Sequence, residues 1–212
     1  MRAERICSPY GRQLEVTAYA GHFASPHAHS SHYLDITPIK HCHLTARAAA
    51  MELAERYALM RNVDTVLCLD GSDVVGAFLA RHLAKKDLIS LNSDKNIAVV
   101  APERGSEGQM LLRDNLVGMV RDKDVLPLIS TIHTGRTARQ ALEGVAYYGG
   151  RVSAVTAIFS AVEAVDGVPV FALFTPTDIP GFVTGAPEAC PLCAAGVKLD
   201  ALVNSYGLSQ LE

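Results

Sequence analysis

The sequence has no excess of basic residues and no long hydrophobic run, and each absence excludes a class of function. Its 212 residues include 19 Lys and Arg against 22 Asp and Glu, which gives a net charge of -3. A chain with this balance offers no basic surface to follow a nucleic-acid backbone, so we expect no DNA or RNA partner. The least polar stretch, residues 152–165, is interrupted by Ser153, Thr156, Ser160 and Glu163. It is too short and too polar to span a bilayer, so we expect no membrane partner either.

Two further absences bear on the cellular compartment. Residues 1–15 contain charged residues, Pro and Gly, and they lack the apolar segment of a secretion signal. The five cysteines are an odd number in a chain without such a signal, which is typical of reduced thiols or metal ligands. We therefore expect a cytoplasmic protein. The length and the 49% of hydrophobic residues suit a single domain spanning residues 1–212.

Apolar runs alternate with segments of helical periodicity along the middle of the chain. The apolar run at residues 65–69 is what a strand buried on both faces requires, and we expect further strands at residues 96–100, 116–120, 125–129 and 152–159. Apolar residues at helical spacing predict helices at residues 44–60, 74–84 and 135–148. This alternation is typical of an α/β fold in which helices flank a mostly parallel sheet. Pro127 interrupts one expected strand, which predicts a local bulge.

One loop between an expected strand and helix has the composition of a phosphate-binding loop. Its residues are His133, Thr134, Gly135, Arg136 and Thr137. The first N–H groups of a helix and its dipole favour an anion, and Gly135 lets the backbone approach a phosphate closely. The two threonine hydroxyls and the Arg136 guanidinium would add hydrogen bonds. No lysine follows Gly135 as it does in the phosphate loops of nucleoside triphosphatases, so we do not expect that activity.

Two residues of this loop have a second interpretation. Thr134 could simply cap the helix that follows. His133 could donate to a phosphate or act as a general acid, or it could be an exposed loop residue, which is the interpretation that we favour. Taken alone, the loop is therefore compatible with binding and with a purely local role.

Three stretches of the chain carry a family resemblance. They are Gly21-His22-Phe23 with His29-Ser30 and Tyr33, Leu128 to Ala138, and Pro187-Glu188-Ala189-Cys190-Pro191-Leu192-Cys193 with Gly196-Val197. Together they resemble the type I phosphoribosyltransferases, and among these the orotate phosphoribosyltransferases. The resemblance implies a five-stranded parallel core at about 44–165, a small hood from about 1–43 and 166–212, and a homodimer. It also implies a sugar phosphate or nucleotide ligand whose 5′-phosphate binds at residues 133–137, and Mg²⁺ as the cofactor of an active enzyme.

The chain departs from this family where ribose would bind. The family has two adjacent acids that hold the ribose hydroxyls and face the cationic sugar of the transition state. The matching positions here are Ile129 and Ser130. Charge-assisted hydrogen bonds contribute roughly 1.5–3 kcal/mol each, and stabilisation of developing charge is often the largest catalytic term. Losing both acids should lower the rate by orders of magnitude, so the sequence leaves open whether the protein is an enzyme.

The chain also departs from the family where pyrophosphate and the base would bind. The pyrophosphate-loop position, Asp70-Gly71-Ser72-Asp73, has two acids that repel a polyanion unless Mg²⁺ bridges them. Alternatively, Asp70 or Ser72 only caps the following helix. The family's mobile loop is rich in Lys and Arg, whereas residues 101–108 hold one basic residue, Arg104, with two Glu. The basic residue that the resemblance implies for orotate is replaced by Ala28.

Cys190-Pro191-Leu192-Cys193 has the spacing of half a tetrahedral Zn²⁺ site. His41 and His43 are the expected additional ligands, because the resemblance places both segments in the hood. His27, His29 and His32 form another close set. Alternatively, the cysteines are two reduced thiols at the start of a short helix.

Three functions follow from these observations. The first is phosphoribosyl transfer to a nucleobase with Mg²⁺, which the resemblance supports and the missing acids oppose. The second is a non-catalytic module that senses a nucleoside 5′-monophosphate or similar sugar phosphate. The third is a zinc-containing variant with a different hydrolytic or structural role.

Overall fold

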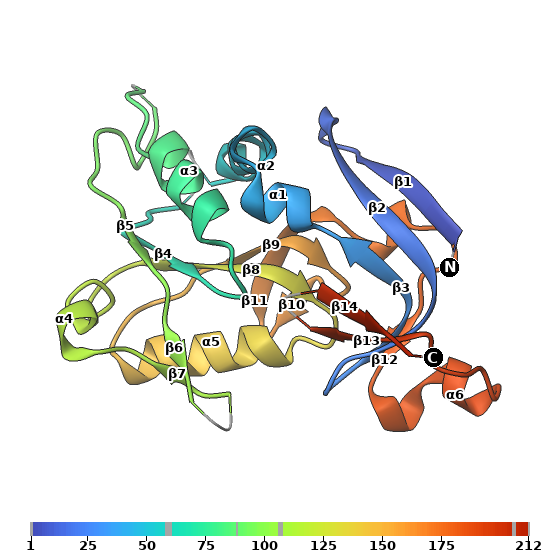
Figure 1. Cartoon of the computed structure of the whole chain (residues 1–212). Coiled ribbons are helices and arrows are strands. Elements are labelled where there is room, and N and C mark those ends of the chain that lie inside the picture. Colours follow the sequence, from blue (N-terminus) through green and yellow to red (C-terminus); the bar gives the residue numbers. More distant parts are fainter. Residues whose placement is uncertain (1, 58–60, 88, 106–107, 205–206, 212) are drawn as a thin grey trace.

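The chain folds around two main β-sheets that lie side by side (Figure 1). The computed structural model describes residues 2–57, 61–87, 89–105, 108–204 and 207–211. One sheet is the parallel core and the other is a hood that combines both ends of the chain. Among the described residues, no helix combines the length and the apolar character needed to cross a bilayer.

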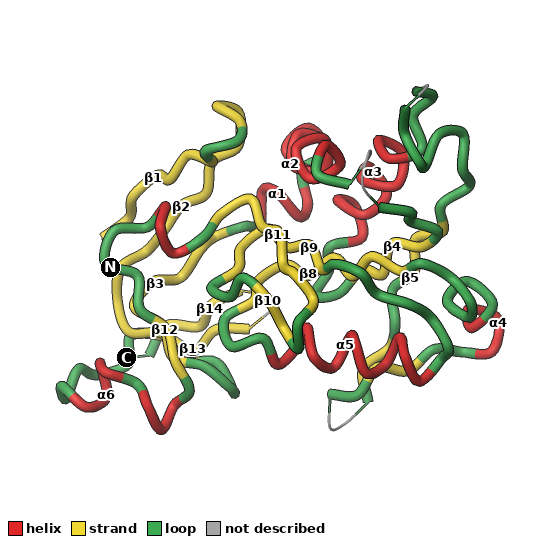
Figure 2. The backbone as a smooth tube through the Cα atoms, turned by 180° about the vertical axis from the view of Figure 1, so that it is seen from behind, coloured by secondary structure: helices red, strands yellow, loops and turns green. Residues whose placement is uncertain are grey.

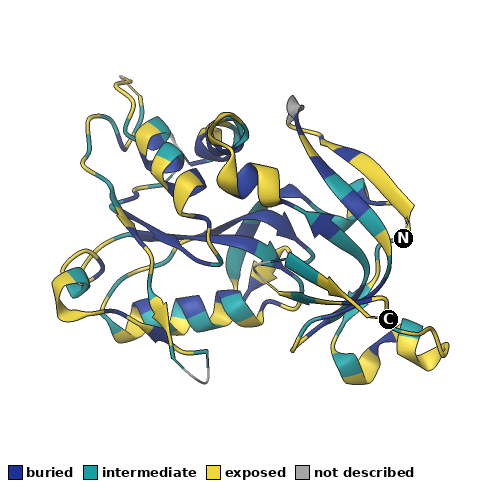
Figure 3. Cartoon of the chain, viewed as in Figure 1, coloured by how far each residue is buried: buried dark blue, intermediate teal, exposed yellow. Residues whose placement is uncertain are grey.

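The core sheet has the strand order β10-β11-β9-β8-β4-β5. Its strands are β4 (Thr65–Cys68), β5 (Ala98–Val100), β8 (Val125–Ile132), β9 (Val155–Ser160), β10 (Ala164–Val165) and β11 (Val168–Phe174). Five of them run parallel, and the short β10 pairs with β11 in the antiparallel sense. Strands β4 and β9 are buried along their whole length (Figure 3), as expected for central strands of a parallel sheet that is covered on both faces. The expected α/β fold with a mostly parallel sheet is confirmed.

Helices cover both faces of this sheet (Figures 1 and 2). Helices α1 (Thr37–His41), α2 (His43–Glu55) and α3 (Asp73–Leu83) lie on one side, and α5 (Arg136–Tyr147) lies on the other. Each face has its own buried cluster. Leu53, Leu79 and Leu128 belong to the first, and Ile129 and Ala138 belong to the second. Residues 58–60, the end of the first expected helix, lie outside the described residues.

The hood is a six-stranded sheet that joins the two ends of the chain. Its strands are β1 (Arg2–Ser8), β2 (Gly11–Ala24), β3 (His29–Asp35), β12 (Thr184–Gly185), β13 (Ala201–Asn204) and β14 (Gly207–Gln210). Strand β13 runs parallel to β2, with Ala201 opposite Phe23. Short elements complete the chain: β6 (Glu103–Arg104), β7 (Met110–Leu111), α4 (Asp114–Val117), α6 (Pro191–Ala194) and the 3-10 turns Pro176–Asp178 and Pro187–Ala189.

One expected strand is wrong and another was missed. Residues 116–120 do not form a strand, because α4 and a following turn occupy this stretch. The fifth parallel strand is instead β11, beyond the expected core boundary at residue 165. A short apolar run with no clear period does not distinguish a strand from a helical turn. Met119 is 41% exposed, so this run does not have the two-sided burial of a central strand.

Pro127 lies in the central strand β8, and its register against β4 is regular, with Leu67 opposite. The N–H of Val125 donates to Arg151 O at 2.8 Å, so a donor at residue 127 would point to the same, β9-facing side. On that side the register shifts by one residue, from the Asp124–Arg151 bridge to the Leu128–Thr156 pair. The expected irregularity therefore lies between β8 and β9, on the side where Pro127 lacks a donor.

Gly76 of α3 packs directly on Cys68 of β4, and a Cβ at Gly76 would overlap the Cys68 Sγ. We predict that Gly76→Ala lowers the free energy of unfolding by about 1–3 kcal/mol because the core is overpacked. In a Cys68→Ala background the same substitution should be neutral or stabilising by up to about 1 kcal/mol, since alanine favours the helix. Urea denaturation of the four proteins measures this coupling. Gly118→Ala, whose Cβ would meet open space, is the control. Equal costs of Gly76→Ala in both backgrounds would contradict the packing.

Candidate functional site

The phosphate-loop residues connect the end of β8 to the start of α5. Gly135 takes a left-handed conformation with φ +82°, and a Cβ there would lie 3.0 Å from Val165 Cγ2. No side chain forms a capping hydrogen bond at the start of α5, so Thr134 does not cap this helix. The helix start is therefore available to an anion, and glycine is the residue that fits this turn.

This loop forms one wall of a cavity of about 320 Å³ between the core and the hood. The opposite walls come from the hood and from α1. The lining residues outside the loop include Ser25, Pro26, His27, Ala28, Lys40, His41, Asp70, Arg104, Val203, Asn204 and Gly207. Segments from both ends of the chain thus face the carboxyl end of the parallel strands, which is where such sheets bind ligands.

The ribose-binding position supplies no charge to this cavity. Side chains alternate along a strand, so Ile129 and Ser130 point to opposite faces. Ile129 is fully buried in the core, whereas Ser130 lines the cavity and donates a hydrogen bond to Asp70 O at 3.0 Å. A neutral hydroxyl is what this position offers to a ligand.

The pyrophosphate-loop position, residues 70–73, is held by contacts within the protein. Asp70 and Gly71 both have positive φ, at 57° and 74°. Ser72 is buried and donates to Leu128 O at 3.0 Å, and it makes no capping hydrogen bond to α3. Asp73 is the first residue of α3, where a carboxylate suits the helix dipole.

Arg104, the basic residue of the expected mobile loop, is bound to Asp70. Its Nη2 lies 2.7 Å from Asp70 Oδ1 in a partly exposed ion pair. Ser106 and Glu107, from the same loop, lie outside the described residues. The acid and the base neutralise each other at the edge of the cavity.

Lys40 is a cavity residue that the sequence analysis missed. It lies on α1 with only 6% of its surface exposed, and a Cβ on Gly71 would be 3.3 Å from its Nζ. Burial lowers the pKa of Lys40, while the nearby carboxylates of Asp70 and Asp73 raise it. No motif in the sequence marks this lysine, because its role depends on how α1 packs beside residues 70–73.

His133 is partly buried, so its interpretation as an exposed loop residue is wrong. Its ring packs against Phe159 and Phe182, with centroid distances of 5.7 and 6.2 Å. Its Nδ1 lies 3.4 Å from Thr184 Oγ1. Burial lowers the pKa of His133 to about 4, which leaves the ring neutral at pH 7. A neutral imidazole can exchange a hydrogen bond with a ligand but cannot act as a general acid at that pH.

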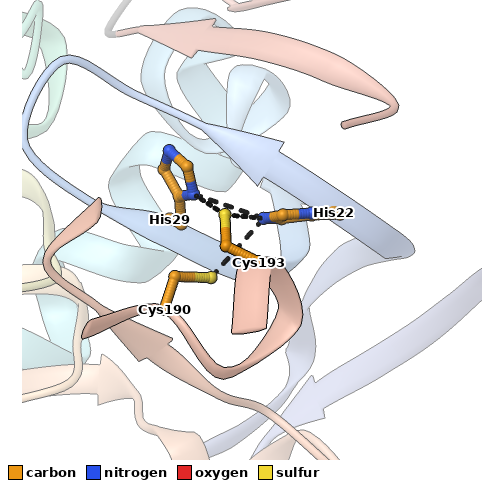
Figure 4. A group of neighbouring side chains, drawn as sticks. All are labelled: His22, His29, Cys190 and Cys193. Carbon is orange, nitrogen blue, oxygen red and sulfur yellow. Dashed lines mark hydrogen bonds between the residues drawn. The ribbon is translucent and has the colours of Figure 1, made fainter. Parts of the chain in front are cut away.

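A separate group of four metal-ligating side chains lies in the hood (Figure 4). His22, His29, Cys190 and Cys193 bring one ligand atom each to within 4.8 Å of one another. The structure thus joins the two cysteines to His22 and His29.

Of the histidines named from the sequence as candidate ligands, His29 joins this group and the other four do not. His41 and His43 are exposed on α1 and α2. His27 is exposed beside the cavity, and His32 stacks on Phe182 at a centroid distance of 6.0 Å. His41 and His43 were expected because the resemblance places both segments in the hood, whereas the group forms with the two histidines on either side of the β2–β3 turn.

The overall fold is that of the type I phosphoribosyltransferases, as comparison with solved structures shows. No family model matches the chain, and no curated protein matches it by sequence. Adenine phosphoribosyltransferase from Trypanosoma brucei, in complex with AMP, pyrophosphate and ribose-5-phosphate, is similar with a TM-score of 0.55 and 17% identity. The match covers 83% of this chain and 80% of that one.

Orotate phosphoribosyltransferase from Mycobacterium tuberculosis H37Rv is similar as well. Its complex with inorganic phosphate has a TM-score of 0.51 and 18% identity, over 70% of this chain and 80% of that one. Its complex with 5-phospho-alpha-D-ribosyl 1-diphosphate has a TM-score of 0.51 and 17% identity, over 69% and 82% of the two chains. Orotate and adenine enzymes thus share this fold with the chain, and the fold alone does not select a base.

The pKa of His133 predicts a specific loss of stability in acid. The unfolded chain titrates His133 near 6.5 and the folded chain near 4, so the unfolded state takes up the proton first. The contribution of the neutral His133 ring to the free energy of unfolding is therefore complete above about pH 6.5. It is lost as the pH falls toward 4, by about 3 kcal/mol in total. Urea denaturation from pH 7 to 4 should show a shallower loss in His133→Gln than in the parent. His27→Gln, at an exposed position, is the control. An unchanged slope in His133→Gln would contradict the buried neutral ring.

Proposed function

We propose that the protein binds a small molecule with a ribose 5′-phosphate group, either a nucleoside 5′-monophosphate or phosphoribosyl pyrophosphate. The observation that carries this proposal is the start of α5, which has no side-chain cap and faces a cavity under the hood. A dianionic phosphate there would accept hydrogen bonds from the N–H groups of the helix start and from Thr134, Thr137 and Arg136. Structural neighbours were solved with inorganic phosphate, phosphoribosyl pyrophosphate or AMP, which supports the same class of ligand.

We propose that binding is stronger than catalysis at this site. Ile129 is buried in the core and Ser130 is neutral, so no carboxylate from this pair faces the sugar. Cleavage of a glycosidic bond develops positive charge on the sugar ring, and its stabilisation requires fixed negative charge. The pair formed by Asp70 and Arg104 has little net charge to offer either the sugar or a leaving pyrophosphate.

The remaining parts of the ligand would face α1 and the hood. Lys40 is a buried cation at the cavity wall, and it favours an anionic or carbonyl-bearing group beyond the ribose. Pyrophosphate would need Mg²⁺ to offset Asp70 and Asp73, so Mg²⁺ is the proposed cofactor of any residual transfer. A homodimer and a cytoplasmic location stay predictions. A nucleotide-sensing role without turnover is the alternative that uses the same cavity.

We predict that Gly135→Ala weakens binding of inorganic phosphate and nucleoside 5′-monophosphates at least tenfold. An added Cβ strains the turn at φ +82° and meets Val165, so the helix start moves. Gly167→Ala is a matched control, because Gly167 has the same φ of +82° with nothing within 4 Å of its Cβ position. Isothermal titration calorimetry measures both variants and the parent. Nucleosides without phosphate serve as negative ligands. Equal affinities in all three proteins, or no binding of any 5′-phosphate by the parent, would refute the proposal.

We also predict slow phosphoribosyl transfer. Two missing charge-assisted hydrogen bonds amount to about 3–6 kcal/mol, or a rate about 10²–10⁴-fold below that of an ordinary enzyme. Assays with phosphoribosyl pyrophosphate, Mg²⁺ and either orotate or adenine measure this rate. Of Ile129 and Ser130, only Ser130 lines the cavity. The variant Ser130→Asp should therefore have a higher turnover than the parent, with phosphate binding retained. Turnover by the parent at about 1–10³ per second would show that the absent acids are not needed.

A further inference from the structure

The four side chains in the hood converge on one point from two distant parts of the chain. His22 lies near the end of β2 and His29 begins β3, while Cys190 and Cys193 flank the start of α6 (Figure 4). His22 Nε2 is 3.3 Å from His29 Nδ1, 3.5 Å from Cys190 Sγ and 3.7 Å from Cys193 Sγ. His29 Nδ1 is 3.2 Å from Cys193 Sγ. Each of these atoms is a metal-ligand type.

The hydrogen bond on the far side of His22 determines which of its nitrogens carries the proton. His22 Nδ1 lies 2.8 Å from the carbonyl oxygen of Val197, which can only accept, so Nδ1 carries the hydrogen. The Nε2 atom is then a bare lone pair that faces His29 and both sulfurs. A single lone pair can accept only one short hydrogen bond from these three neighbours. A cation in their midst would satisfy all four groups together.

We propose that His22, His29, Cys190 and Cys193 bind a structural Zn²⁺ ion. Zn–N bonds of about 2.0–2.1 Å and Zn–S bonds of about 2.3 Å at tetrahedral angles give edges of about 3.3 Å between nitrogens and 3.6 Å between N and S. The observed N–N distance is 3.3 Å and the N–S distances are 3.2, 3.5 and 3.7 Å. Four of the six edges thus match a zinc tetrahedron, and the other two, from Cys190 Sγ to His29 and to Cys193, are no longer than 4.8 Å.

The surroundings favour a structural ion over a catalytic one. Two Cys and two His fill all four positions of a tetrahedral site, which leaves no open position for water or substrate. His22 and Cys190 are buried, and the Val197 carbonyl orients the His22 ring as outer partners of zinc ligands do. Thiolate and imidazole ligands select Zn²⁺ over Mg²⁺ or Ca²⁺.

The ion would tie the two ends of the chain together beside the cavity. The two histidines flank the β2–β3 turn, and the residues of that turn, Ser25 to Ala28, all line the cavity. The cysteines lie more than 160 positions further along the chain, and a cross-link over so long a loop removes much entropy from the unfolded state. Zn²⁺ would therefore fix the turn that covers the ligand.

Metal analysis of the full-length protein, purified without chelators or an affinity metal, tests the proposal directly. We expect one equivalent of zinc per chain in the parent and in the control variant His41→Ala/His43→Ala, which alters two exposed histidines. We expect less than a tenth of an equivalent in Cys190→Ser/Cys193→Ser. Replacement of zinc by Co²⁺ should give the strong visible absorption of a tetrahedral ion with thiolate ligands. Absence of both zinc and this Co²⁺ spectrum in the parent would overturn the proposal, as would equal zinc in the cysteine variant.

His29→Ala keeps the test decisive if the cysteine variant does not fold. His29 is partly exposed, and its loss leaves three ligands, so the Co²⁺ spectrum should shift and zinc affinity should fall at least tenfold. Chelation of zinc from the parent should lower the melting temperature by about 5–10 °C, and added Zn²⁺ should restore it. A melting temperature that chelators do not change, with unchanged zinc affinity in His29→Ala, would contradict these ligands. Each readout is independent of phosphate binding, so it stands or falls separately from the proposed function.

Discussion

The roof of the cavity depends on one junction between the two ends of the chain. The His22 N–H donates to Asp200 Oδ2 at 2.7 Å, and the Asp200 N–H donates to the His22 carbonyl at 2.8 Å. Gly21 allows this approach, because a Cβ there would lie 2.7 Å from Asp200 Oδ2. Strand β13 continues from this junction in parallel pairing with β2, and it carries Val203 and Asn204 to the cavity. A pair of hydrogen bonds in the hood thus holds a strand that lines a cavity whose floor belongs to the core.

The floor and the edges of the cavity differ in charge. The floor ends in a helix start that favours an anion, whereas the sugar position has a hydroxyl and the pyrophosphate position has an acid already paired with Arg104. Because His133 is neutral at pH 7, the loop itself gains its positive potential from the helix dipole and Arg136. This distribution binds a phosphate group without the opposite charges that would polarise the bond to the sugar. The same fold can therefore retain a ligand and lose the means of cleaving it.

The sequence predicts the parts of this molecule that depend on local pattern. Continuous apolar runs identified β4, β8 and β9, and the turn chemistry around Gly135 located the loop before α5. The run at residues 116–120 was misassigned because a strand and a short helical turn have similar composition over five residues. Strand β11 was placed outside the core because its membership depends on pairing with β9, which is a tertiary contact.

The residues that the sequence could not place are those brought together by the hood. His29 was named only in a separate set of histidines, and His22 was not named as a ligand. A register shift in β2 between Ala20 and Phe23 and the turn to β3 bring both to the cysteines. Lys40 was missed for the same reason, since its position depends on α1 packing beside residues 70–73. Proximity in sequence is therefore a weak guide to ligand sets. His22 and His29 lie on either side of a hairpin turn and reach one site, whereas His41 and His43, two positions apart on separate helices, do not.

The β2–β3 hairpin belongs to both sites, and this shared element links them physically. His22 and His29 face the cysteines, while the four residues between the strands face the phosphate loop. A turn of this kind loses backbone entropy when it is fixed, at about 1–2 kcal/mol for each residue. If the hood already holds the ends of the turn, a ligand in the cavity no longer has to order it, and more of its contact energy appears as affinity. The chain ends therefore do more than close the fold, because they prepare the surface against which a sugar phosphate would bind.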